Sequence, residues 1–134
     1  MRRSSFILLA VLSVLAIGAF LFVHFLVPKI AEDRRARLAY EDLRYLSKSV
    51  EEYKSATAVI PTTADGLRIL VERPKPSPAK WKRIIEAIPM DPWGDKYRYR
   101  TLPHGDARGF EIRSAEPDGV DGTTDDLSSL DPIE

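Results

Sequence analysis

The chain has 134 residues, which is room for one domain of ordinary size. It carries 20 basic and 20 acidic side chains and no cysteine, which excludes a disulfide framework, a thiolate metal site and a cysteine nucleophile. All 20 acids but only 18 of the bases lie from residue 28 onward, and the resulting net charge of −2 does not indicate a nucleic-acid partner.

A long apolar segment lies near the N-terminus. Residues 6–27 read FILLAVLSVLAIGAFLFVHFLV, without Asp, Glu, Lys or Arg, and about 20 such residues form a helix that crosses ~30 Å of hydrocarbon. The apolar core of a cleaved signal is only about 7–15 residues long and ends at a small-x-small site, whereas this run continues to Pro28. We therefore expect a retained transmembrane helix over residues 6–27, between a short terminus of residues 1–5 and a domain of residues 28–134.

Basic residues flank this segment on both sides, and they bear on its orientation. Arg2 and Arg3 precede it, and four bases follow it: Lys29, Arg34, Arg35 and Arg37. The positive-inside rule, taken literally, favours a cytoplasmic domain.

An apolar stripe after Pro28 predicts a long amphipathic helix. Its members are spaced by alternating threes and fours: Ala36, Ala39, Leu43, Leu46, Val50 and Tyr53. Two partners fit the stripe, either the chain's own domain or a coiled-coil contact with another subunit. Both can hold along different stretches of one helix.

Prolines divide the middle of the chain. Pro61 ends the long helix, and Thr62 or Thr63 can cap a short helix that runs to Val71. Residues 74–78, PKPSP, predict a stiff extended connector. We expect one or two further helical turns over residues 81–88.

Period-two alternation replaces the helical pattern after residue 94. Residues 96–100 and 110–113 predict two strands, and residues 103–109 have turn composition. The predicted fold is therefore α+β: a long N-terminal transmembrane and amphipathic helix packed on a small antiparallel sheet. The arginines and tyrosines of the first strand are explained by the two faces of a half-buried strand.

An acidic loop follows the second predicted strand. Residues 114–129 read SAEPDGVDGTTDDLSS, which places Asp118, Asp121, Asp125 and Asp126 among glycines and hydroxyl residues. Calcium takes six to eight hard oxygen ligands of this kind, although the spacing is not that of an EF-hand. The composition of this segment taken alone favours the alternative interpretation, a solvated turn rich in Asp and Gly.

Three stretches, taken in order, resemble the major pseudopilin of bacterial type II secretion. They are IPTTADGL at residues 60–67, MDPWGDKY at 90–97, and EPDG at 116–119 followed by Asp125 and Asp126. In that family a YPTT-x-x-GL turn, a DPWG-x-x-Y segment and a GADG…DD calcium loop follow a long N-terminal helix. The resemblance covers residues 27–129 and implies a pilin-like fold.

The resemblance also implies a ligand set for a structural calcium ion. Asp118 and Asp125 would bind it through their side chains, with Asp126 as a third. Backbone carbonyls near Ala115 and Thr123 would complete the shell.

Other expectations follow from the same resemblance. Residues 91–94 match a fold-defining turn in which Trp93 is a buried plug. The protein is expected to be single-pass in the bacterial inner membrane, with residues 1–5 cytoplasmic and residues 28–134 periplasmic. Its expected partners are other pseudopilin subunits and inner-membrane components of the secretion system.

The N-terminus departs from the family pattern. Ser5-Phe6 replaces the glycine-phenylalanine junction that prepilin peptidase cleaves, and the family's membrane glutamate falls on or beside Ala10. We therefore expect a pseudopilin-like structural subunit that is accessory or unprocessed. The alternative is a membrane-anchored periplasmic binding module, stabilised by calcium, outside the filament. An enzyme is not expected, since His24 and His104 are the only histidines and no nucleophile motif is present.

Overall fold

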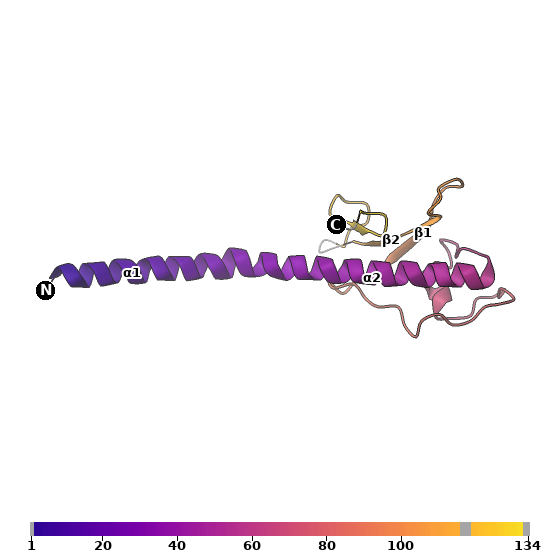
Figure 1. Cartoon of the computed structure of the whole chain (residues 1–134), viewed down its shortest axis with the longest axis horizontal. Helices are drawn as coiled ribbons and strands as arrows, with labels where there is room; N and C mark the ends of the chain where they lie inside the picture. Colours follow the sequence, from indigo (N-terminus) through magenta and orange to yellow (C-terminus); the bar gives the residue numbers. More distant parts are fainter. Residues whose placement is uncertain (1, 116–118, 133–134) are drawn as a thin grey trace. The chain divides into compact units, whose positions relative to one another are not determined.

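The computed structural model describes residues 2–115 and 119–132 and divides the chain into two units, Met1–Arg35 and Ala36–Glu134. The first unit is helical and contains α1 (Arg2–Leu21), the π-helical turn η1 (Phe22–Leu26) and the beginning of α2 (Val27–Thr57). Figure 1 labels α1 and α2. Within the described residues, one helix is long and apolar enough to cross a membrane, and it contains the apolar segment of residues 6–27. The large apolar side chains of the run are 45–70% exposed, so this surface is free to contact lipid or other helices.

The π-helical turn has a local cause in the sequence. Pro28 has no backbone N–H, and its ring crowds the carbonyl of His24, four residues earlier. The helix widens at this point, and the N–H of Val27 bonds to the carbonyl of Phe22, five residues back. The helical path therefore continues through the proline into α2.

The second unit is built on the C-terminal part of α2. The predicted apolar stripe is buried at Ala39, Leu43, Leu46, Val50 and Tyr53, and the last four belong to one hydrophobic core with the sheet. Over this stretch the stripe therefore packs on the chain's own domain, as the first of the two predicted alternatives stated. The helix ends at Thr57.

A three-stranded antiparallel sheet covers one side of α2. Its strands are β1 (Arg98–Thr101), β2 (Phe110–Ser114) and β3 (Leu127–Ser128), in the order β1-β2-β3. Tyr99 pairs with Ile112, and Arg113 pairs with Ser128. The long helix with a small antiparallel sheet confirms the predicted fold, but β3 was missed because a two-residue strand has no alternation to detect.

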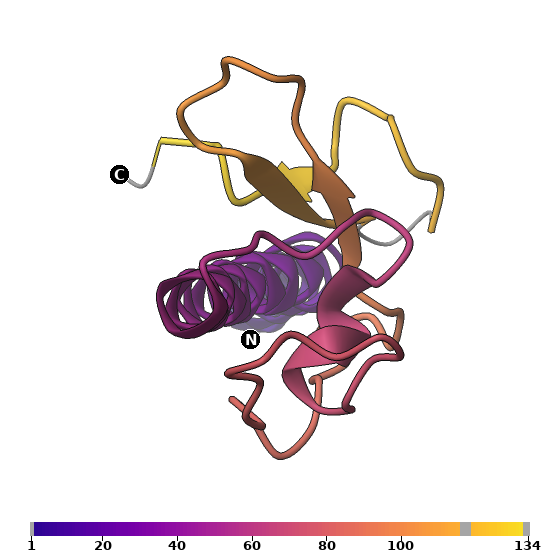
Figure 2. The same cartoon turned by 90° about the vertical axis from the view of Figure 1, so that its right-hand side faces the viewer.

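The chain leaves α2 along the sheet, where the Thr63 hydroxyl bonds to that of Thr101 at 2.9 Å. Most of the remaining segment before β1, including η2, lies on another side of the helix, as the view along the axis in Figure 2 shows. The predicted short helix is present as a five-residue 3-10 turn, η2 (Gly66–Leu70), which buries Leu67, Ile69 and Leu70. Thr62 and Asp65 bond to each other just before it.

The helical turns predicted for residues 81–88 were wrong. This segment has no helix and is held by tertiary bonds instead: the Trp81 indole donates to the carbonyl of Ile69 at 2.8 Å, and the N–H of Ile84 donates to that of Leu70 at 2.8 Å. Because the backbone N–H of Ile84 bonds to η2, this donor is satisfied without an internal helix.

Two tyrosines connect the sheet region to the rest of the unit. The Tyr97 hydroxyl donates to Oδ2 of Asp42 on α2 at 2.9 Å, and the Tyr99 hydroxyl donates to the carbonyl of Pro61 at 2.8 Å. Burial raises the pKa of both phenols well above the ordinary value, so both remain protonated donors at neutral pH.

Candidate functional site

The predicted metal ligands lie in the loop that leaves β2 and returns as β3. Ala115 is buried directly after β2, whereas Thr123, Asp125 and Asp126 lie in the turns that precede β3. Asp118 lies outside the described residues. The loop is therefore anchored at both ends by strands of the same sheet.

Asp126 is the most enclosed of the loop acids that the structure describes, with a side chain only 5% exposed. Its Oδ2 accepts a hydrogen bond from the N–H of Gly122 at 2.7 Å, and its Oδ1 accepts one from the Thr123 hydroxyl at 3.3 Å. Gly122 has φ 93°, a conformation that glycine adopts without strain. The structure thus brings Thr123 and Asp126 together, while the exposed Asp125 carboxylate has no polar partner among the described residues.

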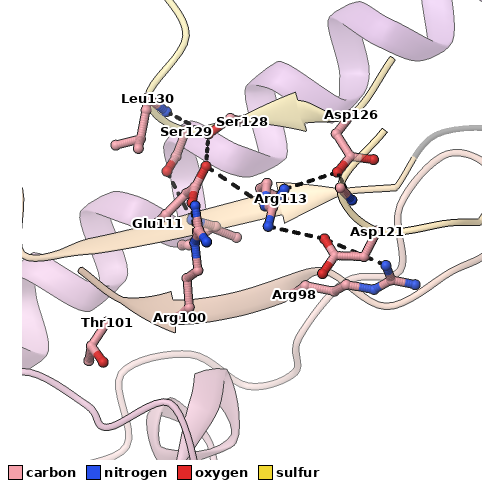
Figure 3. Close-up of polar contacts among 12 residues, drawn as sticks. Arg98, Arg100, Thr101, Glu111, Arg113, Asp121, Asp126, Ser128, Ser129 and Leu130 are labelled. Carbon is pink, nitrogen blue, oxygen red and sulfur yellow. Dashed lines mark hydrogen bonds and ion pairs between the residues drawn. The ribbon is translucent and has the colours of Figure 1, made fainter. Parts of the chain in front are cut away.

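Two arginines of the sheet form ion pairs with acids of the loop, as Figure 3 shows. Arg113 on β2 forms ion pairs with Asp126 at 3.1 Å and Asp121 at 3.3 Å. Arg98 on β1 also reaches Asp121, at 3.6 Å, and donates to the carbonyl of Gly119 at 2.9 Å. Sequence reasoning missed these arginines as site residues, because the alternation places them on one face without indicating which segment covers that face.

Glu111 connects the loop arginine to the rest of the sheet. Its side chain is 7% exposed and pairs with Arg100, with Arg113 at 3.8 Å and with the Ser128 hydroxyl at 2.7 Å. Burial raises the pKa of Glu111, but the hydrogen bonds from Ser128 and Arg100 and the charges of Arg100 and Arg113 outweigh burial and hold it below its ordinary value. The carboxylate is therefore charged at neutral pH.

The donor set of the loop fits a hard cation in its chemistry. The predicted ligands supply only carboxylate and carbonyl oxygens, which calcium prefers. Among residues 2–115 and 119–132, no three histidine, cysteine or acidic side chains gather as metal ligands. A shell drawn from this loop therefore depends on backbone carbonyls and on Asp118.

A buried acid, Asp91, stabilises the turn at residues 91–94. Asp91 is 4% exposed, and its Oδ1 accepts from the N–H groups of Trp93 at 3.1 Å and Asp95 at 2.8 Å. Its Oδ2 accepts from the Ser114 hydroxyl at 2.6 Å, which ties the turn to the end of β2. Trp93 is only partly buried, so the expectation of a buried plug was wrong.

Known proteins resemble this chain over most of its length. The family described as type II secretion system (T2SS), protein G, matches residues 27–131. The type II secretion system core protein G of Pseudomonas aeruginosa is 28% identical over 136 residues, covering 96% of this chain and 94% of the relative. The protein of the same name from Vibrio cholerae is 32% identical over 127 residues, covering 90% and 85%.

A solved structure agrees with these sequence matches. The crystal structure of the major pseudopilin from the type 2 secretion system of enterohaemorrhagic Escherichia coli matches with a TM-score of 0.66 at 30% identity. The match covers 78% of this chain and 91% of the solved one.

The long apolar helix, the small antiparallel sheet and this structural match define a protein of the pseudopilin class. The chain belongs to the family of type II secretion system protein G. As such it is a structural subunit of the secretion apparatus and works with other pseudopilin subunits, which confirms the resemblance predicted from its three motifs.

Proposed function

We propose that this subunit is single-pass in the bacterial inner membrane, spanning it with residues 6–27 and placing residues 28–134 in the periplasm. The supporting observation is the exposure of the large apolar side chains from Phe6 to Val27, which leaves them free for lipid and for the helices of other subunits. Family membership supports the periplasmic side, against the count of flanking bases. The same helix makes other pseudopilins and inner-membrane components the expected partners.

Crosslinking through the apolar helix tests this role. The chain has no cysteine, so Leu15→Cys, at a side chain 64% exposed, introduces a unique thiol. Oxidation of membranes from cells that carry the secretion system is expected to give disulfide-linked products only after matching cysteines are placed in other pseudopilins. The same variants expressed singly control for random collision. Monomer alone in every pairing would favour the alternative, a calcium-stabilised periplasmic binding module outside the filament.

We further propose that the chain remains unprocessed and serves as an accessory subunit. Ser5 replaces the glycine of the peptidase junction, and Ala10 stands at or beside the position of the membrane glutamate. The intact mass of the full chain extracted from membranes is therefore expected to begin at or near Met1. A mass that begins at Phe6 would show processing and would contradict the accessory assignment.

We propose that the acidic loop holds a structural calcium ion. Asp118, Asp125 and Asp126 would bind it through carboxylates, and Ala115 and Thr123 through backbone carbonyls. Two observations support this assignment: the donor set consists of oxygens only, and the exposed Asp125 carboxylate has no polar partner within residues 2–115 and 119–132. A calcium ion there would neutralise the carboxylates, and its expected signature is a calcium-dependent rise in the melting temperature of the full chain.

A catalytic role is not part of this proposal. The family consists of structural pseudopilins. The sequence has only two histidines, His24 in the apolar segment and His104 in the turn between the first two strands. The metal we propose is accordingly structural.

A further inference from the structure

One arginine stands between the carboxylates of the acidic loop. The guanidinium of Arg113 lies 3.1 Å from Oδ2 of Asp126 and 3.3 Å from Oδ1 of Asp121, and its side chain is only 18% exposed. A guanidinium presents five N–H donors in a planar fork, so it can pair with two carboxylates at once. Because the pair with Asp126 is shielded from water, it is screened less than a surface ion pair.

The loop acids also stabilise the sheet, because they offset a repulsion between two of its arginines. Arg98 and Arg113 are directly opposite each other on β1 and β2, and like charges in that arrangement repel. Asp121 pairs with both of them, at 3.6 and 3.3 Å. The loop therefore supplies the negative charge that allows two arginines to occupy neighbouring strands.

The buried Glu111 carboxylate also contacts Arg113, through a nitrogen that the loop acids do not use. The Nε of Arg113 lies 3.8 Å from Oε1 of Glu111, which also accepts from Ser128 on β3. Arg113 is thus positioned by the sheet while its outer nitrogens contact the loop, an arrangement visible in Figure 3. Such a preorganised side chain loses little further freedom when it pairs with the loop.

We propose that Arg113 is a built-in counter-ion of the acidic loop, which holds the loop on the sheet without a metal ion. A second clause rests on the calcium site proposed above: an ion bound through Asp126 competes with Arg113 for that carboxylate. A divalent cation close to a guanidinium is repelled by it, so Arg113 weakens calcium binding. This chain accordingly depends less on calcium for its stability than it would without Arg113.

Thermal unfolding of the full chain in detergent micelles tests both clauses. Arg113→Met keeps an apolar stem of similar length and removes the charge. In a calcium chelator it is expected to melt about 5–10 °C below the wild type, because two loop carboxylates lose their counter-ion. Titration with calcium is then expected to raise the melting temperature of the variant by more degrees than that of the wild type.

Arg108→Met is the matched control. Its guanidinium pairs with Asp106 in a different loop, and its side chain is 58% exposed, so its melting temperature is expected to stay within about 2 °C of the wild type. Arg113→Lys keeps the charge but not the fork, and an intermediate melting temperature is expected. If Arg113→Met does not fold, Asp126→Asn decides, because it removes the buried carboxylate that Arg113 pairs with: melting at the wild-type temperature in chelator would contradict the proposal.

The remaining outcomes separate this proposal from the calcium site. Equal melting temperatures of Arg113→Met and the wild type in chelator would overturn the proposal that Arg113 is the counter-ion of the loop. A destabilised variant, with no response to calcium in either protein, supports the counter-ion and removes the calcium site. An equal gain from calcium in both proteins supports calcium binding and overturns the competition.

Discussion

Replacing Asp91 with alanine is expected to lower the free energy of unfolding of the domain by about 3–4 kcal/mol. The Asp91 carboxylate is buried and accepts from two backbone N–H groups and from the Ser114 hydroxyl. Truncation leaves these three donors without their acceptor, and each unsatisfied donor that is buried costs about 1–3 kcal/mol. The result is the loss of the contact that ties the 91–94 turn to β2.

The measurement is thermal unfolding of the full chain in detergent, followed by tryptophan fluorescence, where this loss corresponds to about 15 °C or more. Asp91→Asn keeps one acceptor oxygen and is expected to lose roughly half as much. Asp95→Ala, at the exposed neighbouring acid, is the control and should change little. If Asp91→Ala melted like Asp95→Ala, the buried carboxylate would not be what stabilises this turn.

Glu111→Gln is expected to destabilise the domain by about 2–3 kcal/mol at neutral pH. The variant removes the buried negative charge that pairs with Arg100 and Arg113 while keeping the shape of the side chain. Two arginines on neighbouring strands then lose a shared counter-ion. Glu86→Gln, whose side chain is 92% exposed, is the control and should be nearly neutral.

The pH profile gives an independent measurement of the same contact. The pKa of Glu111 is lower in the folded chain than its ordinary value of 4.5, so the unfolded chain binds its proton more readily. Its contribution is fully present above about pH 4.5 and is lost as the pH falls through the lowered folded pKa. The melting temperatures of the wild type and Glu111→Gln are therefore expected to converge in acid, and a constant difference would contradict this account.

The spacing of apolar residues was sufficient to predict the helix and strands that bury one face at regular intervals. The stripe from Ala39 to Tyr53 and the alternation around Ile112 predicted the helix and the first two strands, because a burial pattern at a fixed spacing is written into the sequence. The same reasoning failed for residues 81–88, where bonds from Trp81 and Ile84 to η2 replaced the helix. It also failed for β3, which pairs only because the loop returns to β2.

The calcium ligands of the candidate site stay predictions. Composition located the acidic loop, and the resemblance selected Asp118, Asp125, Asp126, Ala115 and Thr123. The arginines were not assigned to the site, because a strand pattern shows that side chains share a face but not which other segment covers that face. Knowledge of the register, with Arg98 opposite Arg113, would have raised the question of their counter-ion.

The apolar segment of residues 6–27, the α+β class and the family could be recognised before the fold was known, since each depends on local composition, spacing or motif order. Which charged side chains pair with each other depends on the folded chain. Arg113 lies between Asp121 and Asp126 because the returning chain of β3 brings the loop over the polar face of β2. Pairing of charges distant in sequence is a property of the folded chain, since it requires the strands to be in register first.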